Sequence, residues 1–211
     1  MSVALLKRDL ELLETLTSRV RFLSVRQVTR IWWPQHRSDD RTRRRLRRLA
    51  AAGVVELHRI NLRLLPATNG PVFVWRPGAD EPDAASLSDV FRNRWSDAAR
   101  PIEVCVATSV TANLFASTAF RLPRLEQRDH DMLLATVYVQ YRQRRPDLAA
   151  RWIGEHVLPK AGYRVKDPDA FLRADDGRIA RVIEAAGRYS AEHIENFHEH
   201  CVEFDLPYEL W

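Results

Sequence analysis

The chain has 211 residues, 45% of them hydrophobic, which is enough for one large or two small domains with packed cores. Its net charge is +5, and the positive excess lies in residues 1–100, which carry 19 basic and 11 acidic residues. Two cysteines are too few for a disulfide framework, and no apolar run approaches the roughly 18 residues of a membrane span. This composition excludes disulfide-rich and membrane-spanning classes and predicts a cytoplasmic protein whose first half attracts polyanions.

Three helices are predicted in the first 53 residues. The first is indicated by leucines at helical spacing: Leu6, Leu10, Leu13 and Leu16. The second begins at Ser24, which forms a capping-box pattern with Gln27, and ends before Pro34. The third begins near Ser38 and ends at Gly53, because glycine best adopts the left-handed conformation that closes a helix.

The third predicted helix contains six arginines within the eight residues 41–48. At about 100° per residue, Thr42, Leu46 and Leu49 share one face. The outward side then carries Arg41, Arg44 and Arg48, with Arg45 and Arg47 on its flanks. Because the run holds no acid to pair with these cations, a helix that enters a groove of double-stranded DNA is favoured over a solvated charged face.

Two β-rich runs, residues 54–60 and 72–75, follow the arginine helix on either side of a turn-rich segment. Three helices followed by a two-stranded ribbon is the order of a winged helix, with the third helix as recognition helix. Arg59, Arg63 and Arg76 lie on or beside this predicted wing and are candidate DNA contacts. Arg59 and Arg63 are equally explained as edge-strand charges that block aggregation.

The segment near residues 77–88 is rich in turn residues and acids, so it predicts a linker. The expected organisation is a DNA-binding domain over 1–80, a linker with a connecting helix over 81–100, and an α/β domain over 101–211. Residues 102–106 predict a strand, and helices are expected from Asp129 to the residue before Pro146 and again after Asp147. His130, at the start of a helix, is interpreted as a capping residue or as a candidate acid, base or ligand.

A hairpin is predicted where Asp176 and Gly177 separate two apolar runs. It places Asp169 beside Glu184 on the partner strand, and Glu155 upstream offers a third oxygen ligand. Carboxylates this close suit a hard divalent cation such as Mg²⁺, which polarises a phosphodiester and activates water. The alternative is a pair of surface carboxylates that flank a turn.

The predicted winged helix, the hairpin that follows Pro168 and the closing helix together resemble the replication-relaxation family, whose members are accessory proteins of plasmids and other mobile elements. The resemblance implies a restriction-endonuclease-like fold with a motif of Pro-Asp, a gap, then Asp/Glu-x-Lys. Pro168, Asp169 and Glu184 match this motif. Ala186 stands at the lysine position, and the family's lysine helps to activate the attacking water, so the nuclease is expected to be degenerate.

The last predicted helix, residues 191–204, is capped by Ser190 and carries several candidate metal ligands: His193, His198, His200 and Cys201. These side chains fall on different flanks of the helix, so they do not converge on a zinc ion. The closing segment 206–211 is apolar and predicts either a strand at a sheet edge or a tail that binds a partner. Homodimerisation through the C-terminal half is therefore expected.

The sequence thus predicts an α+β protein, a winged helix-turn-helix followed by an α/β domain that resembles the restriction-endonuclease-like fold. Its expected function is that of a double-stranded DNA-binding accessory or regulatory protein of a mobile element, directed by DNA sequence or structure. Such a protein acts in replication, mobilisation or transcription control, needs no cofactor to bind DNA, and can take a further protein partner. The alternative is a Mg²⁺-dependent nuclease or nickase with Asp169 and Glu184 as catalytic residues.

Overall fold

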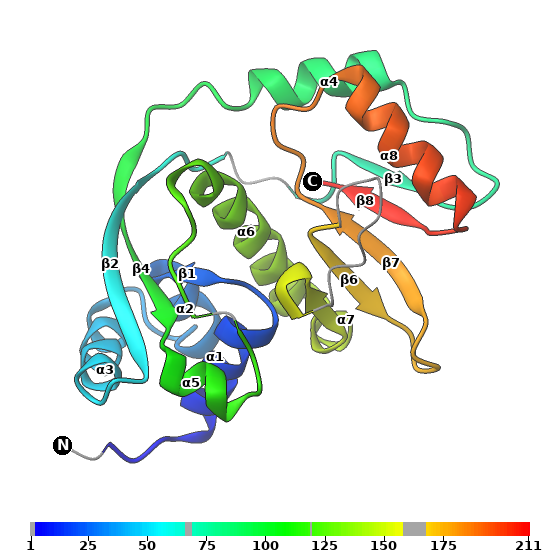
Figure 1. Ribbon diagram of the computed structural model, residues 1–211. Coiled ribbons are helices and arrows are strands. Elements are labelled where there is room, and N and C mark those ends of the chain that lie inside the picture. The colour runs from blue at the N-terminus through cyan, green and yellow to red at the C-terminus, as the bar shows by residue number, and fades with distance from the viewer. Residues whose placement is uncertain (1–2, 66–68, 119, 158–167) are drawn as a thin grey trace.

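The computed structural model describes residues 3–65, 69–118, 120–157 and 168–211 and shows an α+β protein built on two sheets (Figure 1). The first sheet has three antiparallel strands in the order β1-β4-β2. These strands are β1 (Phe22–Ser24), β2 (Val55–Leu62) and β4 (Arg100–Ala107). Helices α1 (Lys7–Ser18), α2 (Val25–Trp32), α3 (Asp40–Ala51) and α5 (Ser109–Leu114) complete what we call the first lobe.

The second sheet has the strand order β3-β8-β7-β6-β5, in which only the neighbours β7 and β8 are parallel. Its strands are β3 (Phe73–Trp75), β5 (Trp152–Gly154), β6 (Ala170–Arg173), β7 (Ile179–Glu184) and β8 (Tyr208–Leu210). With helices α4 (Ala84–Asn93) and α8 (Ala191–Glu203) it forms the second lobe. The predicted hairpin is confirmed as β6 and β7, with Gly177 at φ +85° in the turn.

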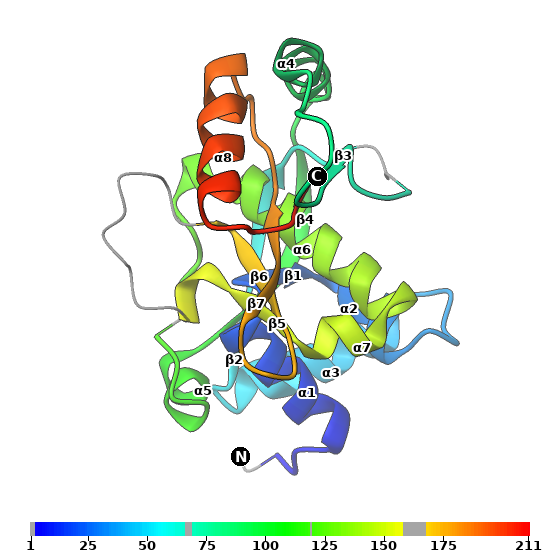
Figure 2. The same cartoon turned by 90° about the vertical axis from the view of Figure 1, so that its right-hand side faces the viewer.

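Helix α6 (Arg128–Arg144) lies between the two sheets and joins the lobes into one core (Figure 1). Its Tyr138 belongs to the same buried cluster as Leu23 of β1 and Ile183 of β7. On the other side of the second sheet, Phe197 of α8 packs in a separate cluster with Val182 of β7, so α6 and α8 cover opposite faces (Figure 2). The remaining short helices are α7 (Pro146–Ala150), η1 (Leu125–Gln127) and η2 (Glu155–Val157).

The three helices predicted at the N-terminal end are confirmed, and so are the capping box that begins α2 and the glycine that follows α3. The Ser24 side chain accepts from the Gln27 backbone N–H, and the Gln27 side chain accepts from the Ser24 backbone N–H, which completes the capping box of α2. The chain leaves α3 through Gly53 at φ +74°. The predicted cap of α3 at Ser38 is one residue off: the N-cap is Asp39, and the Ser38 hydroxyl accepts from the Asp40 backbone N–H.

The inward face predicted for the first helix is only half right. Leu13 and Leu16 are buried, but Leu6 and Leu10 are each close to half exposed. The buried stripe of α1 instead begins at Asp9. Leu12, Leu13 and Leu16 form the apolar part of this stripe, and Asp9 at its start meets an arginine of α3.

The predicted pairing of the two β-rich runs with each other is wrong. Strand β2 pairs along its whole length with β4, from Val55 opposite Ala107 to Leu62 opposite Arg100, whereas β3 pairs with β8. The physical reason is the length of each strand and its position in a sheet. β4 matches the eight residues of β2 and lies between two neighbours, whereas β3 has three residues and suits a sheet edge.

This pairing also corrects the predicted domain boundaries. β3 belongs to the second sheet although it lies within residues 1–80, and β4 belongs to the first sheet although it lies within 101–211. The segment between β2 and β4, which includes the predicted linker, carries β3 and α4 into the second lobe and returns (Figure 1). The chain therefore passes from the first lobe to the second and back before α6 begins.

The closing segment is not a free tail. Tyr208, Leu210 and Trp211 are buried, and β8 lies between β3 and β7 inside the second sheet. The exposed apolar tail on which the expected dimer partly depended is therefore absent from this structure. Within the described ranges, no helix combines the length and the apolar character needed to cross a membrane.

Candidate nucleic-acid interface

Helix α3 is fixed by a narrow buried face. Thr42, Leu46 and Leu49 are fully buried, as the helical spacing predicts. The Thr29 hydroxyl of α2 donates to the Thr42 hydroxyl at 2.9 Å, so a buried polar contact sets the two helices against each other. The opposite face of α3 is consequently presented to solvent in one defined orientation.

The exposed face of α3 carries arginines without acidic partners. The exposed members are Arg41, Arg44, Arg47 and Arg48, in agreement with the predicted outward side. Within the residues that the structure describes, none of these four makes an ion pair. The Arg41 Nη1 lies 3.3 Å from Nε2 of the His36 ring. Four guanidinium groups are therefore available to a polyanion.

Arg45, also predicted to contact DNA, differs from its exposed neighbours because it forms an ion pair. Its Nε and Nη2 donate to the two oxygens of Asp9, at 3.0 and 2.5 Å, and the Asp9 side chain is fully buried. The hydrogen bond to Asp9 raises the pKa of the Arg45 guanidinium. Arg43 is likewise engaged, with its Nε 2.6 Å from a Glu103 oxygen of β4. These two arginines fasten α3 to α1 and to the first sheet.

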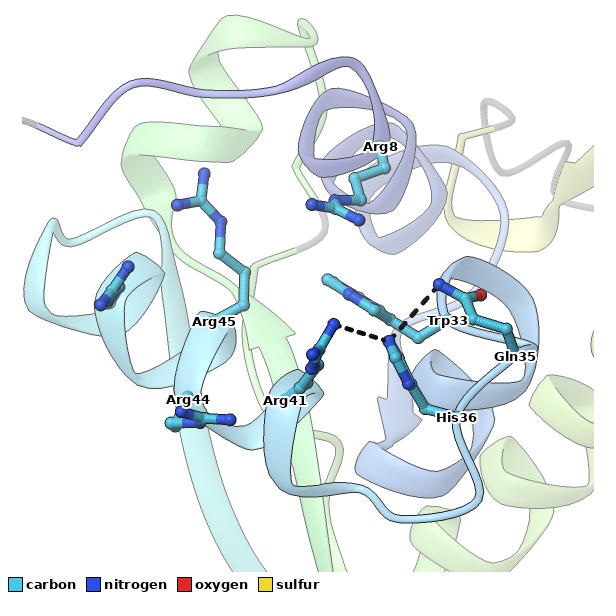
Figure 3. A pocket seen from close by; sticks show the side chains of 8 residues that line it. Arg8, Trp33, Gln35, His36, Arg41, Arg44 and Arg45 are labelled. Carbon is cyan, nitrogen blue, oxygen red and sulfur yellow. Dashed lines mark hydrogen bonds between the residues drawn. The ribbon is translucent and has the colours of Figure 1, made fainter.

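A solvent-open hollow of about 390 Å³ lies on the flank of α3 (Figure 3). Its walls come from α1, from the end of α2 with the loop after it, and from α3. The lining residues are Arg8, Trp33, Gln35, His36, Arg41, Arg44, Arg45 and Arg48. None of them is acidic. Sequence reasoning did not assign Arg8, Trp33 or His36 to this surface, because only the folded chain brings three separate elements together.

The arginines predicted for the wing are dispersed. Arg59 is exposed on β2 and lies opposite Glu103 of β4. Arg63 follows β2 and pairs with Asp129, which accepts from its backbone N–H at 2.8 Å and lies 3.6 Å from its Nη1. Arg76 follows β3 in the second sheet, so it does not lie on a ribbon with β2. Arg59 is the member of this group that stays closest to its predicted position.

The carboxylates of the predicted nuclease motif are adjacent but buried. Asp169 is 1% and Glu184 2% exposed. An Asp169 oxygen accepts from the Ala185 N–H at 2.8 Å and lies 3.0 Å from His130 Nε2. Glu184 accepts from the Asp169 backbone N–H at 3.3 Å and from the Tyr189 hydroxyl. Burial, reinforced by Glu184, raises the pKa of Tyr189, so the tyrosine keeps the proton that it donates.

Glu155, the third predicted oxygen ligand, forms an ion pair with an arginine. The Glu155 carboxylate accepts from Arg21 Nη2 at 2.7 Å, while the Glu155 backbone N–H donates to the Asp169 carbonyl. In the part of the chain that the structure describes, no group of three acidic, histidine or cysteine side chains is arranged to hold a metal ion. On α8, His198 is buried, and its Nδ1 lies 2.9 Å from the Tyr208 hydroxyl.

At the motif's lysine position stands the buried Ala186, and the cation of Arg94 contacts its carbonyl. Ala186 is fully buried in the cluster beneath α4 and α8. Arg94, just after α4, donates from Nη2 to the Ala186 carbonyl and to the Trp211 carbonyl, the latter at 2.6 Å. Burial lowers the pKa of Arg94 to about 10, so the guanidinium stays charged near neutral pH. Its Nη2 holds two backbone carbonyls.

No protein-family model matches the chain, and searches of curated proteins and of solved structures likewise find no match. Function is therefore inferred from the geometry described above.

Proposed function

We propose that this protein binds double-stranded DNA through α3 and that its first lobe is a winged helix in which β2 and β4 form the ribbon. The observation that carries the proposal is the two-sided character of α3, with one face buried against α2 and four exposed arginines on the other. The first sheet supports it, because one strand precedes α2 and two follow α3. A guanidinium row of this kind matches phosphates and the guanine edges of a major groove.

The resemblance described above supplies the biological setting of the proposal, an accessory or regulatory role in the replication, mobilisation or transcription of a mobile element. DNA binding by itself needs no cofactor here, since the positive charge is provided by side chains. In this proposal Arg59, exposed on β2, adds a contact to the DNA backbone, whereas Arg45 contributes to the position of the helix.

The decisive experiment measures binding of the full-length chain to labelled duplex DNA at several salt concentrations by fluorescence anisotropy. The full chain is needed because residues 1–80 lack β4, the middle strand of the first sheet. About five phosphate contacts would give a log–log slope of about −4 to −5. Replacing Arg41, Arg44 and Arg48 together by alanine should flatten this slope by about 2 to 3 units.

A matched control removes the same charge elsewhere. Arg124, Arg173 and Arg178 are exposed and lie outside the first lobe, so their combined replacement by alanine should change DNA affinity much less. Both triple variants should unfold within about 0.5 kcal/mol of the wild type, because the replaced side chains are exposed. A triple α3 variant that binds as tightly as wild type at every salt concentration would contradict the proposal.

Metal-dependent cleavage is the second candidate, favoured by one observation, the adjacency of Asp169 and Glu184 at the start of β6 and the end of β7. We expect no cleavage of plasmid DNA in Mg²⁺ or Mn²⁺, since Ala186 stands at the lysine position. We also expect Asp169→Asn and Glu184→Gln to leave DNA affinity unchanged. Cleavage by wild type that disappears in both variants would establish the nuclease instead.

We also propose that the protein forms a homodimer through its second lobe. The first lobe carries unpaired cations that repel a second copy, while Val202 and Phe204 at the end of α8 are each about half exposed. Light scattering should give a dimer for the wild type and a monomer for Phe204→Ser combined with Val202→Ser. A monomeric wild type would contradict this proposal and leave DNA binding untouched.

A further inference from the structure

The hollow beside α3 holds more charge than its helix alone supplies. Arg8 enters it from α1, on the wall opposite Arg41 and Arg44 (Figure 3). The Arg8 guanidinium lies over the Trp33 ring, 4.9 Å from its centroid. Trp33 is 5% exposed, so its ring is a fixed support under Arg8. A cation held over an aromatic face loses less freedom when it binds an anion than a free side chain does.

The balance of charge within the hollow favours an anion. Arg45 is neutralised by Asp9. The other cations that line the hollow, Arg8, Arg41, Arg44 and Arg48, make no ion pair with any described residue. A guanidinium over an aromatic ring keeps N–H groups at its edge that can donate. Such edges bind phosphate oxygens in a bidentate way.

We propose that this hollow binds one internucleotide phosphate of duplex DNA, with Arg8 and Arg41 donating from opposite walls. The inference rests on the proposed DNA binding by α3 and adds α1 to the interface. A phosphate held here fixes the strand that passes between α1 and α3, because backbone contacts set the register of a protein on the duplex. Trp33 acts as a positioning residue that supports Arg8.

The test uses the full-length chain and a pair of neighbouring cations on α1. Arg8→Gln removes a guanidinium that lines the hollow, and Lys7→Gln removes an equal charge from an exposed residue that does not line it. We expect Arg8→Gln to weaken binding at about 0.1 M salt roughly tenfold and to reduce the salt slope by about 0.9. Lys7→Gln should weaken binding less than about twofold and leave the slope in place. Arg8→Lys keeps the charge without the planar fork and should fall between wild type and Arg8→Gln.

Two results would overturn the inference while DNA binding stands. One is equal binding by Arg8→Gln and Lys7→Gln when the triple α3 variant is weakened. The other is dependence of affinity on 5′-phosphates when blunt duplexes with and without them are compared, since that would assign the hollow to a strand end. A wild type that binds no duplex at any salt concentration would instead refute the proposed function itself. Thermal unfolding of the three α1 variants, expected to match wild type, shows that any loss of affinity is not a loss of fold.

Discussion

In the first lobe, four exposed arginines of α3 make no ion pair with any described residue, whereas in the second lobe the acids Glu184 and Glu209 lie buried among donors. Charged side chains therefore have different roles in the two lobes. An exposed cation costs little to keep and is available to a ligand, while a buried carboxylate must be satisfied by its own chain. Which lobe a charged residue belongs to, and whether it is buried there, decides whether its removal affects binding or folding.

The largest expected effect is on stability, at Glu209 of β8. Its oxygens accept from the Tyr141 hydroxyl at 2.7 Å, from Trp211 Nε1 at 2.8 Å and from Arg181. Glu209→Gln leaves the Arg181 cation without its counter-charge, so the free energy of unfolding should fall by about 3 kcal/mol. Urea unfolding followed by circular dichroism measures this change. Glu199→Gln on the exposed side of α8 is the control, and a loss at Glu209 no larger than that of the control would break the comparison.

A smaller effect tests the exception within the first lobe. Arg45→Ala leaves Asp9 buried without its partner, so we expect the unfolding free energy to fall by about 2 to 3 kcal/mol. Arg44→Ala, one residue earlier on the exposed face, should change it by less than about 0.5 kcal/mol and should instead weaken DNA binding. Equal stability of the two variants would show that burial of Asp9 does not distinguish these arginines.

The pH dependence of stability tests the role of the buried histidine of α8, His198. Burial lowers the pKa of His198 in the folded protein below that of the unfolded chain. The contribution of the neutral imidazole is therefore complete above the unfolded pKa of about 6.5 and is lost as pH falls below it. His198→Phe keeps a ring against Trp75 and should flatten the loss of unfolding free energy between neutral and mildly acidic pH. An unchanged profile in the variant would assign the acid sensitivity to other groups.

The smallest expected difference is between the alkylation rates of one cysteine in each lobe, which report whether the lobes unfold together. Cys105 lies in β4 of the first sheet and Cys201 in α8 over the second, and burial raises the pKa of each thiol to about 12. Neither thiol should react with iodoacetamide until its lobe opens. Because one buried cluster joins both sheets through α6, their rates should agree within about tenfold, or about 1.4 kcal/mol. Mass spectrometry of the alkylated peptides measures both rates, and a gap of a thousandfold would mean that the lobes unfold separately.

The features that could be predicted from the sequence depend on near neighbours in the chain. The capping box of Ser24 with Gln27, the turn at Gly177 and the helix end at Gly53 each involve residues within a few positions of one another. Strand pairing could not be predicted this way. Nothing local to residues 54–60 distinguishes a partner at 72–75 from one at 100–107, and only the matching lengths of β2 and β4 hint at the answer.

The candidate site divides in the same manner. Helical spacing placed Arg41, Arg44 and Arg48 on the exposed face correctly, because that face belongs to one helix. The position of Asp9 one turn before Leu12 and Leu13 was a signal that α1 turns an acid inward, and it could have identified Arg45 as its partner. Arg8 and Trp33 carried no comparable signal, since their meeting depends on how α1 packs against α2.

The passage of the chain between lobes has a consequence for the order of synthesis. The first sheet closes when β4 ends at Ala107, 45 positions after the end of β2. β3 ends at Trp75, yet its partner β8 begins at Tyr208, 133 positions later. At the usual rate of translation, β8 is synthesised about 7 to 27 s after β3. During that interval a growing chain carries Phe73 and Trp75 on an unpaired strand, which is the segment that a chaperone or a second nascent chain would meet first.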